Sequence, residues 1–133
     1  MIKISSKDNP QIKYLVKLYE SKKERDLSNT YIVEGYHLVE EAQKAGVLKQ
    51  VFSVNEEPLY KDAIIITKDL ISKITSTITP EGIIGVCKKT SPIKPISKKV
   101  LYLDKLQDPG NIGTLLRSAL SFNFESIIFD ECV

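Results

Sequence analysis

Apolar residues in the first two thirds of the chain follow two spacings, one typical of helices and one typical of strands. In three segments they lie three and four positions apart, which predicts helices beginning near Asn9-Pro10, after Gly35 and after Thr67. Short continuous apolar runs lie between and after these segments and predict buried strands. The predicted strands are residues 31–34, 50–54, 63–66 and 83–87. The alternation predicts a three-layer α/β/α domain over residues 1–88.

The last third of the chain repeats a shorter version of this pattern. Residues 100–103 predict a strand, Asp108-Pro109-Gly110 predicts a turn, and residues 126–129 predict a second strand. Between turn and strand, helical spacing predicts a helix that starts at Ile112 with Asn111 as its N-cap. Its expected buried stripe is Ile112, Leu115, Leu116 and Ala119.

Residues 89–99 separate the two patterns and are predicted to be a basic, extended linker because they contain Pro92 and Pro95. Residues 100–133 are too few to cover the helix stripe and both sheet edges. We therefore expect them to be the beginning of a larger α/β domain, in a chain that continues or that a partner completes.

Composition restricts the class of protein. Of 133 residues, 42% are hydrophobic and 27% charged, which is ordinary for a globular domain. The longest apolar run, residues 63–66, is too short to span a bilayer, and the first residues lack the apolar core of a signal peptide. These features predict a cytoplasmic protein without a membrane partner.

Positive charge is concentrated in two segments although the net charge is only +2. Residues 1–25 carry seven Lys or Arg against three Asp or Glu, and residues 88–99 carry five lysines and no acid. Each segment fits either a solvated surface or contact with a phosphate backbone.

Cys87, Cys132 and His37 suggest no metal or redox chemistry. The two cysteines match neither a CxxC pair nor a zinc pattern, and His37 has no second ligand at suitable spacing. We expect two buried free thiols, a structural or exposed histidine, and no metal site.

Asn111, Gly113 and Arg117 are the candidate site of the second pattern. Gly113 and Arg117 lie four positions apart, so the glycine leaves room beside the guanidinium at one edge of the helix. The simpler alternative is a cap, a packing glycine and a surface charge. The glycine spacing lacks the third glycine of a dinucleotide fingerprint, and no lysine follows to make a Walker loop.

The segment Asp108–Ala119 resembles the first motif of SpoU-type RNA 2′-O-ribose methyltransferases, which are TrmH-like members of the SPOUT superfamily. Ser6–Lys13, Tyr31–Gly35 and Thr77–Gly82 are similar to the substrate-binding domain of that family. The resemblance implies methylation of a ribose 2′-hydroxyl in rRNA or tRNA, with S-adenosyl-L-methionine as cofactor. It also implies that residues 100–133 begin an α/β knot domain.

Further expectations rest on the same resemblance. The cofactor-binding knot is expected beyond Val133, so residues 1–133 alone are predicted to be inactive, and the complete form is predicted to be a homodimer. Matching positions assign RNA contact to four residues, namely Lys13, Lys23, Arg25 and Glu34. Asn111 and Arg117 are the implied catalytic residues. Because a guanidinium stays protonated above pH 12, Arg117 is better suited to electrostatic stabilisation than to simple base catalysis.

Two alternatives to an enzyme remain open from the sequence. One is a non-catalytic RNA-binding module with a vestigial methyltransferase tail. The other is a small α/β protein with no role in RNA binding. RNA affinity that falls as salt rises separates the second from the first, because neutralised phosphates release counterions.

Overall fold

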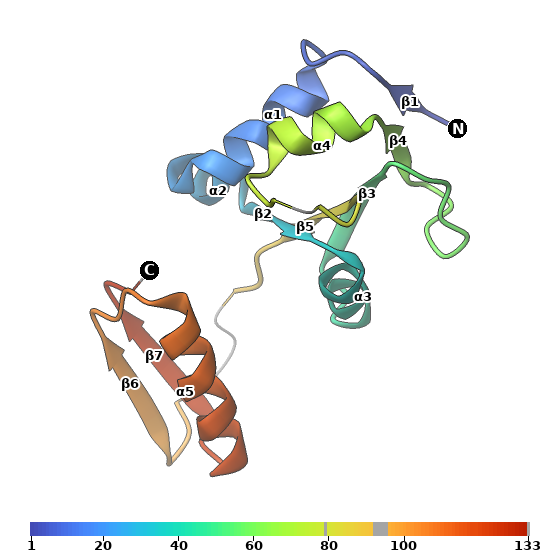
Figure 1. Cartoon of the computed structure of the whole chain (residues 1–133). Coiled ribbons are helices and arrows are strands. Elements are labelled where there is room, and N and C mark those ends of the chain that lie inside the picture. Colours follow the sequence, from blue (N-terminus) through green and yellow to red (C-terminus); the bar gives the residue numbers. More distant parts are fainter. Residues whose placement is uncertain (79, 92–95, 133) are drawn as a thin grey trace. The chain divides into compact units, whose positions relative to one another are not determined.

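The computed structural model describes residues 1–78, 80–91 and 96–132, and the chain divides into two compact units, Met1–Ser91 and Pro92–Val133 (Figure 1). We call them unit 1 and unit 2 and describe each by itself. Pro92, Lys94 and Pro95 of the predicted linker and Thr79 of the Thr77–Gly82 motif lie outside the described residues. Within the described ranges, no helix is long and apolar enough to cross a membrane.

Unit 1 has the three-layer α/β/α architecture that the spacing of apolar residues predicts (Figure 1). Helices α1 and α4 cover one face of a five-stranded sheet, and α3 covers the other. The elements are β1 (Lys3–Ile4), α1 (Pro10–Glu20), α2 (Lys22–Ser28), β2 (Thr30–Glu34), α3 (Tyr36–Lys44), β3 (Leu48–Ser53), β4 (Ile64–Ile66), α4 (Lys68–Ile74) and β5 (Ile83–Lys88).

The sheet of unit 1 has the strand order β1-β4-β3-β5-β2. Strands β1, β4 and β3 are parallel neighbours, while β5 is antiparallel to both β3 and β2. Strands β2, β3 and β4 therefore end at the same edge of the sheet, where β5 begins. We call it the carboxyl edge, and its strand-end residues are Glu34, Ser53 and Ile66.

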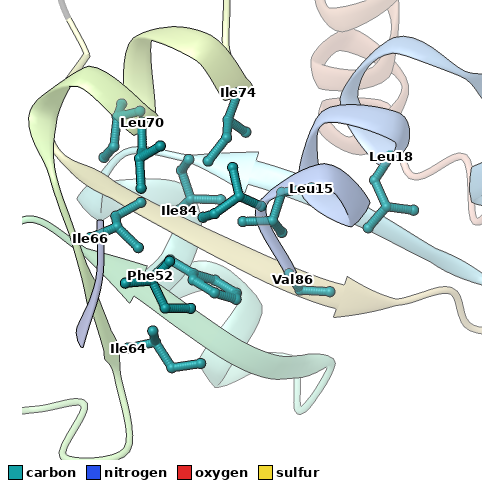
Figure 2. Packing of buried hydrophobic residues seen from close by; sticks show 12 residues of the cluster. Leu15, Leu18, Phe52, Ile64, Ile66, Leu70, Ile74, Ile84 and Val86 are labelled. Atoms are coloured by element: carbon teal, nitrogen blue, oxygen red, sulfur yellow. The ribbon is translucent and has the colours of Figure 1, made fainter. Parts of the chain in front are cut away.

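The main core of unit 1 lies between the sheet and the α1–α4 face (Figure 2). Leu15 of α1 and Ile84 of β5 are both 0% exposed. Burial of a side chain of this size stabilises the fold by about 1.5–3 kcal/mol. Figure 2 shows leucine and isoleucine side chains of the two helices gathered over Phe52 and Val86. The spacing of apolar residues in α1 predicts that Ile12, Leu15, Val16 and Tyr19 face the core, but Leu18 is buried whereas Tyr19 is 38% exposed.

Helix starts in unit 1 follow the capping residues in the sequence. The Asn9 side chain accepts a hydrogen bond from the Gln11 N–H at 2.9 Å, and Pro10 occupies the first turn of α1. Thr67 caps α4 in the same way, with Oγ1 accepting from the Leu70 N–H at 3.4 Å. Both predicted starts are confirmed. Sequence patterning missed β1, which has only two residues, and α2, which buries no residue.

Unit 2 is the predicted strand-helix-strand. It consists of β6 (Val100–Asp104), α5 (Pro109–Ser121) and β7 (Ser126–Asp130), with the two strands parallel and paired from Val100↔Ser126 to Asp104↔Asp130. The expected stripe of α5 is only partly buried: Ile112 and Ala119 are buried, Leu116 is half-buried and Leu115 is 36% exposed. The physical reason is that a two-stranded sheet is too narrow to cover the whole stripe.

The start of α5 differs from the prediction. The helix begins at Pro109, and Asp108 is its N-cap, with Oδ1 accepting from the Gly110 N–H at 2.8 Å. Proline is pre-organised for the first helical position because its φ is fixed, and aspartate directly before it is a favourable cap. The assignment of Asn111 as N-cap is therefore wrong. Asn111 lies inside the first turn, so its side chain has no capping role.

Candidate functional site

Arg117 lies one turn after Gly113 on α5, as the spacing predicts. A Cβ atom at Gly113 would lie 3.4 Å from Nη1 of Arg117, so the guanidinium rests beside the glycine backbone. Nη2 donates a hydrogen bond to Oγ1 of Thr114 at 3.3 Å, and that hydroxyl donates to the Gly110 carbonyl at 3.0 Å. The positive charge of Arg117 is thus held over the first two turns of α5.

Asn111 and Arg117 are both exposed, so they face solvent and not an enclosed cavity. A cavity of about 380 Å³ in unit 2 is lined by Ser97, Lys98, Lys99, Asn123 and Glu125, and includes neither Asn111 nor Arg117. The structure therefore does not place the two candidate residues in a cavity, and we assign the described residues of this unit no cofactor contact. What they present is a fixed cation on an open helix surface.

In unit 1, two of the motif segments meet at the carboxyl edge. Oγ1 of Thr77 donates to Oε2 of Glu34 at 2.9 Å. Oε2 of Glu81 accepts from the Tyr36 N–H at 2.8 Å. We call Glu34, Gly35, Tyr36, Thr77 and Glu81 the motif junction. Sequence reasoning named Glu34 but missed Tyr36 and Glu81, whose pairing across 45 residues no local pattern indicates.

Gly35 explains why Glu81 acts as the cap of α3. Gly35 is the N-cap residue of α3 and offers no side chain, so the carboxylate of Glu81 satisfies the helix start from another segment. A Cβ at Gly35 would lie 3.1 Å from Oε2 of Glu81, and the residue has φ +97°. Both the close approach and the positive φ require glycine at this turn.

The hydroxyl of Tyr36 extends the junction toward the β3–β4 loop. It donates to Oε1 of Glu57 at 2.7 Å, and Oγ of Ser53 donates to the same oxygen at 3.1 Å. The hydrogen bond to the Glu57 carboxylate raises the pKa of Tyr36, because ionisation would place two negative charges together. The carboxyl edge is therefore rich in carboxylates, which accept hydrogen bonds from bases and ribose but repel phosphate.

Arg25, assigned to RNA by resemblance, is used within the fold. Its Nη1 donates to the Leu18 and Tyr19 carbonyls at 2.7 and 3.1 Å and so satisfies the C-terminal end of α1. The Tyr19 hydroxyl in turn hydrogen-bonds with Oγ of Ser76 at 2.7 Å. The Ser76–Thr77 segment thus links the region of Arg25 to Glu34.

Lys13 and Lys23 are exposed on α1 and α2. The structure does not place them in the motif junction. They lie on the helical side of unit 1, where an ammonium is accessible to a phosphate. A role of Lys13, Lys23, Arg25 or Glu34 in RNA contact remains a prediction.

Parts of the lysine-rich segment are fixed to the units. Lys89 forms an ion pair with Asp26, and the hydrogen bond from its ammonium lowers the pKa of that carboxyl. Nζ of Lys99 donates to the Phe122 carbonyl at 2.7 Å and lies 5.0 Å from the centre of the Phe124 ring. Lys89 and Lys99 thus each make a contact within the fold, while Lys99 remains exposed.

The cysteines are free, as expected. Cys87 is buried, and desolvation raises the pKa of its thiol. Cys132 is only half-buried, which corrects the expectation that both are buried. His37 is exposed on α3. Among the described residues, no group of three or more His, Cys, Asp or Glu is arranged to hold a metal ion.

Comparison with known proteins identifies relatives of both units. Residues 9–85 match the family described as the MRM3-like substrate binding domain. The chain is 35% identical to 23S rRNA (guanosine(2553)-2′-O)-methyltransferase RlmP of Bacillus subtilis, over 98% of this chain and 55% of that protein. It is 31% identical to mitochondrial rRNA methyltransferase 3 of Mus musculus, over 87% of this chain and 32% of that protein.

A solved structure agrees with these relatives. The AdoMet-bound rRNA methyltransferase from Sinorhizobium meliloti has a TM-score of 0.78 and 28% identity, covering 98% of this chain and 55% of that one. The chain thus spans about half the length of these two bacterial proteins and about a third of the mouse protein. The resemblance noted in the sequence is confirmed at the level of family and fold.

Proposed function

We propose that this chain, which belongs to the family of MRM3-like substrate-binding domains, binds rRNA through unit 1 and contributes the first catalytic motif of a ribose 2′-O-methyltransferase through unit 2. The observation that carries the proposal is the continuous match to RNA methyltransferases across 98% of the chain, which includes the α5 motif as well as the substrate-binding domain. The proposed cofactor is S-adenosylmethionine.

The geometry of α5 supports a role for Arg117 in this reaction. S-adenosylmethionine, when bound, supplies a methyl group on a sulfonium. A ribose hydroxyl is a weak nucleophile, so it needs stabilisation of the alkoxide that forms as its proton leaves. The guanidinium of Arg117 stays protonated and is held by Thr114, so it can stabilise that oxygen or orient a neighbouring phosphate. Asn111 is proposed to orient the ribose through its amide.

The motif junction supports RNA contact by unit 1. Its carboxylates at Glu34 and Glu81 are fixed by Thr77 and by the Tyr36 N–H, so they are pre-organised acceptors for base or ribose hydroxyl donors. Exposed lysines such as Lys13 and Lys23 supply phosphate affinity on the helical side. Base and ribose contacts identify RNA, whereas phosphate contacts add affinity without choosing sequence.

The test is methyl transfer by the protein as its gene encodes it. Labelled S-adenosylmethionine and total RNA are supplied, and label is located at ribose 2′-O positions. We expect incorporation that Arg117→Ala reduces by about 10²-fold or more, in the range of a lost electrostatic stabiliser. Thr114→Val, which removes the hydroxyl that holds the guanidinium, is expected to give a smaller loss. Label at a base, or full activity in Arg117→Ala, contradicts the proposal.

A non-catalytic RNA-binding module is the alternative that the sequence leaves open, and the relatives, which are named as methyltransferases, do not favour it. It predicts RNA binding that weakens as salt rises, with no label incorporated. No RNA affinity at any salt concentration would contradict both candidates.

We also propose that the complete protein is a homodimer. Leu120, Phe122 and Phe129 of unit 2 are 78%, 69% and 52% exposed, and apolar surface of this kind favours self-association. Sedimentation equilibrium should give twice the monomer mass, and a monomer at micromolar concentration would contradict it.

A further inference from the structure

A cavity of about 460 Å³ opens at the carboxyl edge of unit 1, beside the motif junction. Its apolar lining residues are Val54 and Pro80, which are partly exposed, and Ile71 of α4, which is only 1% exposed. The polar lining residues include Asn55, Lys68 and Glu81, all of which are exposed. The volume lies within the range of small-molecule sites.

The walls of this cavity are held by the fold. The Val54 N–H donates to the Gly82 carbonyl at 2.9 Å, which fixes the end of β3 to the turn that precedes β5. The carboxylate of Glu81 is fixed by the Tyr36 N–H at 2.8 Å through Oε2. The cavity therefore exists without a ligand, and the bond to Tyr36 leaves Oε1 of Glu81 to accept from something else.

The polar groups of the rim match the atoms of a nucleotide. The Asn55 amide both donates and accepts, Oε1 of Glu81 accepts from an N–H of a base edge, and the Lys68 ammonium suits a phosphate. Among the described residues, no hydrogen bond or ion pair uses the Asn55 amide or the Lys68 ammonium. Val54 and Pro80 are both partly exposed and offer an apolar surface for the face of a base.

A base inside a double helix cannot enter such a cavity, because its edges are paired and its faces stacked. A phosphate alone does not fit either, because the Glu81 carboxylate repels it and the apolar lining residues offer it no hydrogen bond. We propose that this cavity receives a single unpaired nucleobase of the RNA substrate, with its face on Val54 and Pro80 and its edge on Asn55 and Glu81. The inference rests on the proposed function, because it specifies how the bound RNA is read.

The first experiment measures the affinity of the chain for a 23S rRNA transcript. Ser72 lines the cavity and is exposed, so Ser72→Trp should fill the space with little effect on the core. We expect its Kd to rise about tenfold. Asn55→Ala should raise Kd about fivefold through a lost base contact, and Lys68→Ala about fivefold through a lost phosphate contact. Lys73→Ala is the matched control, since Lys73 is an exposed lysine of α4 that does not line the cavity. It should change Kd less than twofold.

The second experiment probes the RNA chemically. A base-specific reagent should show an unpaired base whose Watson–Crick edge is protected by the wild-type chain and becomes reactive again with Asn55→Ala. Thermal unfolding of each variant confirms that it is folded.

The two experiments separate the inference from the proposed function. If the wild-type chain binds no rRNA, the proposed function fails and the inference fails with it. If the chain binds, the inference is overturned when Ser72→Trp binds as well as wild type, when Lys68→Ala and Lys73→Ala weaken binding equally, or when no single base is protected.

Discussion

Units 1 and 2 differ in how completely their apolar residues are covered. In unit 1, helices pack on both faces of the sheet, and Leu15, Leu18, Val39, Ile83 and Ile84 are all 0% exposed. In unit 2, the buried apolar residues among those described are Leu103, Ile112 and Ala119, while large side chains such as Leu120 and Phe122 face solvent. Hydrophobic stabilisation follows the area removed from water, so unit 1 carries most of the stability of the chain.

The same contrast separates the two candidate sites. The motif junction of unit 1 is built from side chains that hold one another, as in the bonds of Thr77 to Glu34 and of Tyr36 to Glu81. Arg117 of unit 2 is held by one hydroxyl on its own helix. The side chains of the motif junction are thus fixed by contacts between different segments, whereas Arg117 is fixed by a contact within its own helix.

The largest expected effect is on the free energy of unfolding, and it compares a buried leucine of unit 1, Leu15, with an exposed leucine of unit 2, Leu120. Leu15→Ala should lower the free energy of unfolding of unit 1 by about 2–5 kcal/mol, because it leaves a cavity in a closed core. Leu120→Ala, at a side chain 78% exposed, should change the stability of unit 2 by less than about 0.5 kcal/mol. Urea unfolding followed by NMR signals of β5 and β7 measures each unit. Equal losses would show that unit 2 is as well packed as unit 1.

The next largest effect is on stability when Gly85 of unit 1 or Gly113 of unit 2 is replaced by alanine, and the two changes are expected to have opposite signs. A Cβ at Gly85, in the buried β5, would lie 2.8 Å from Cδ1 of Leu48 and 3.1 Å from Cγ2 of Val33, so Gly85→Ala should destabilise unit 1 by about 1–3 kcal/mol. At Gly113 the nearest atom is Nη1 of Arg117 at 3.4 Å, and Gly113→Ala should stabilise α5 by about 0.5–1 kcal/mol. The same urea experiment measures both. A destabilising Gly113→Ala would mean that Arg117 is packed more tightly than an open helix surface allows.

How much the sequence predicts differs between the units for the same reason. In unit 1, helices cover both faces of the sheet, so the apolar residues of each element face a core and their spacing reveals the element. The three-layer fold and the helix starts at Pro10 and Lys68 therefore follow from the pattern. In unit 2, the stripe at Leu115 and Leu116 is not fully covered, and the cap falls on Asp108 and not on Asn111. Two capping residues compete there, and Pro109 decides between them by fixing φ.

The candidate sites show which contacts local sequence patterns predict and which they do not. The pairing of Gly113 with Arg117 follows from helical periodicity alone and is found in the structure. The contacts of Glu81 with Tyr36 and of Arg25 with the end of α1 depend on how segments meet in three dimensions. A resemblance places residues such as Arg25 in a site, but it does not separate a residue that binds a ligand from one that holds the fold.

Replacing either arginine of the chain by alanine should have a smaller effect on stability, and it tests whether the residue holds the fold or binds a ligand. Arg25→Ala leaves the Leu18 and Tyr19 carbonyls without their charged donor and should lower the free energy of unfolding of unit 1 by about 1–2 kcal/mol. Arg117→Ala, at an exposed side chain, should change stability by less than about 0.5 kcal/mol. Thermal unfolding measures both, with Lys23→Ala as a control of equal charge next to Arg25. If Arg25→Ala leaves stability unchanged but abolishes RNA affinity, Arg25 is primarily a ligand contact.

The smallest effect concerns a pair of tyrosines, one in each unit, whose hydroxyls donate to carboxylates. Tyr102 of β6 donates to Asp130 at 2.6 Å, which raises its pKa from 10.0 to about 12, and Tyr36 donates to Glu57 at 2.7 Å, which also raises its pKa. For a tyrosine, the raised folded-state pKa means that the bond stabilises the fold fully below pH 10. The contribution of Tyr102 should then disappear as the pH rises from about 10 to about 12.

Tyrosinate absorbance tests this directly, as the difference between the titration of wild type and that of Tyr102→Phe or Tyr36→Phe. We expect the Tyr102 difference to have its midpoint near pH 12 and the Tyr36 difference to lie above pH 10. A Tyr102 midpoint at the ordinary value, with Tyr36 still raised, would mean that the bond to Asp130 does not persist in solution. In that case the β6–β7 pair is looser than its backbone register indicates, and the contrast between the two units extends from their apolar cores to their polar contacts.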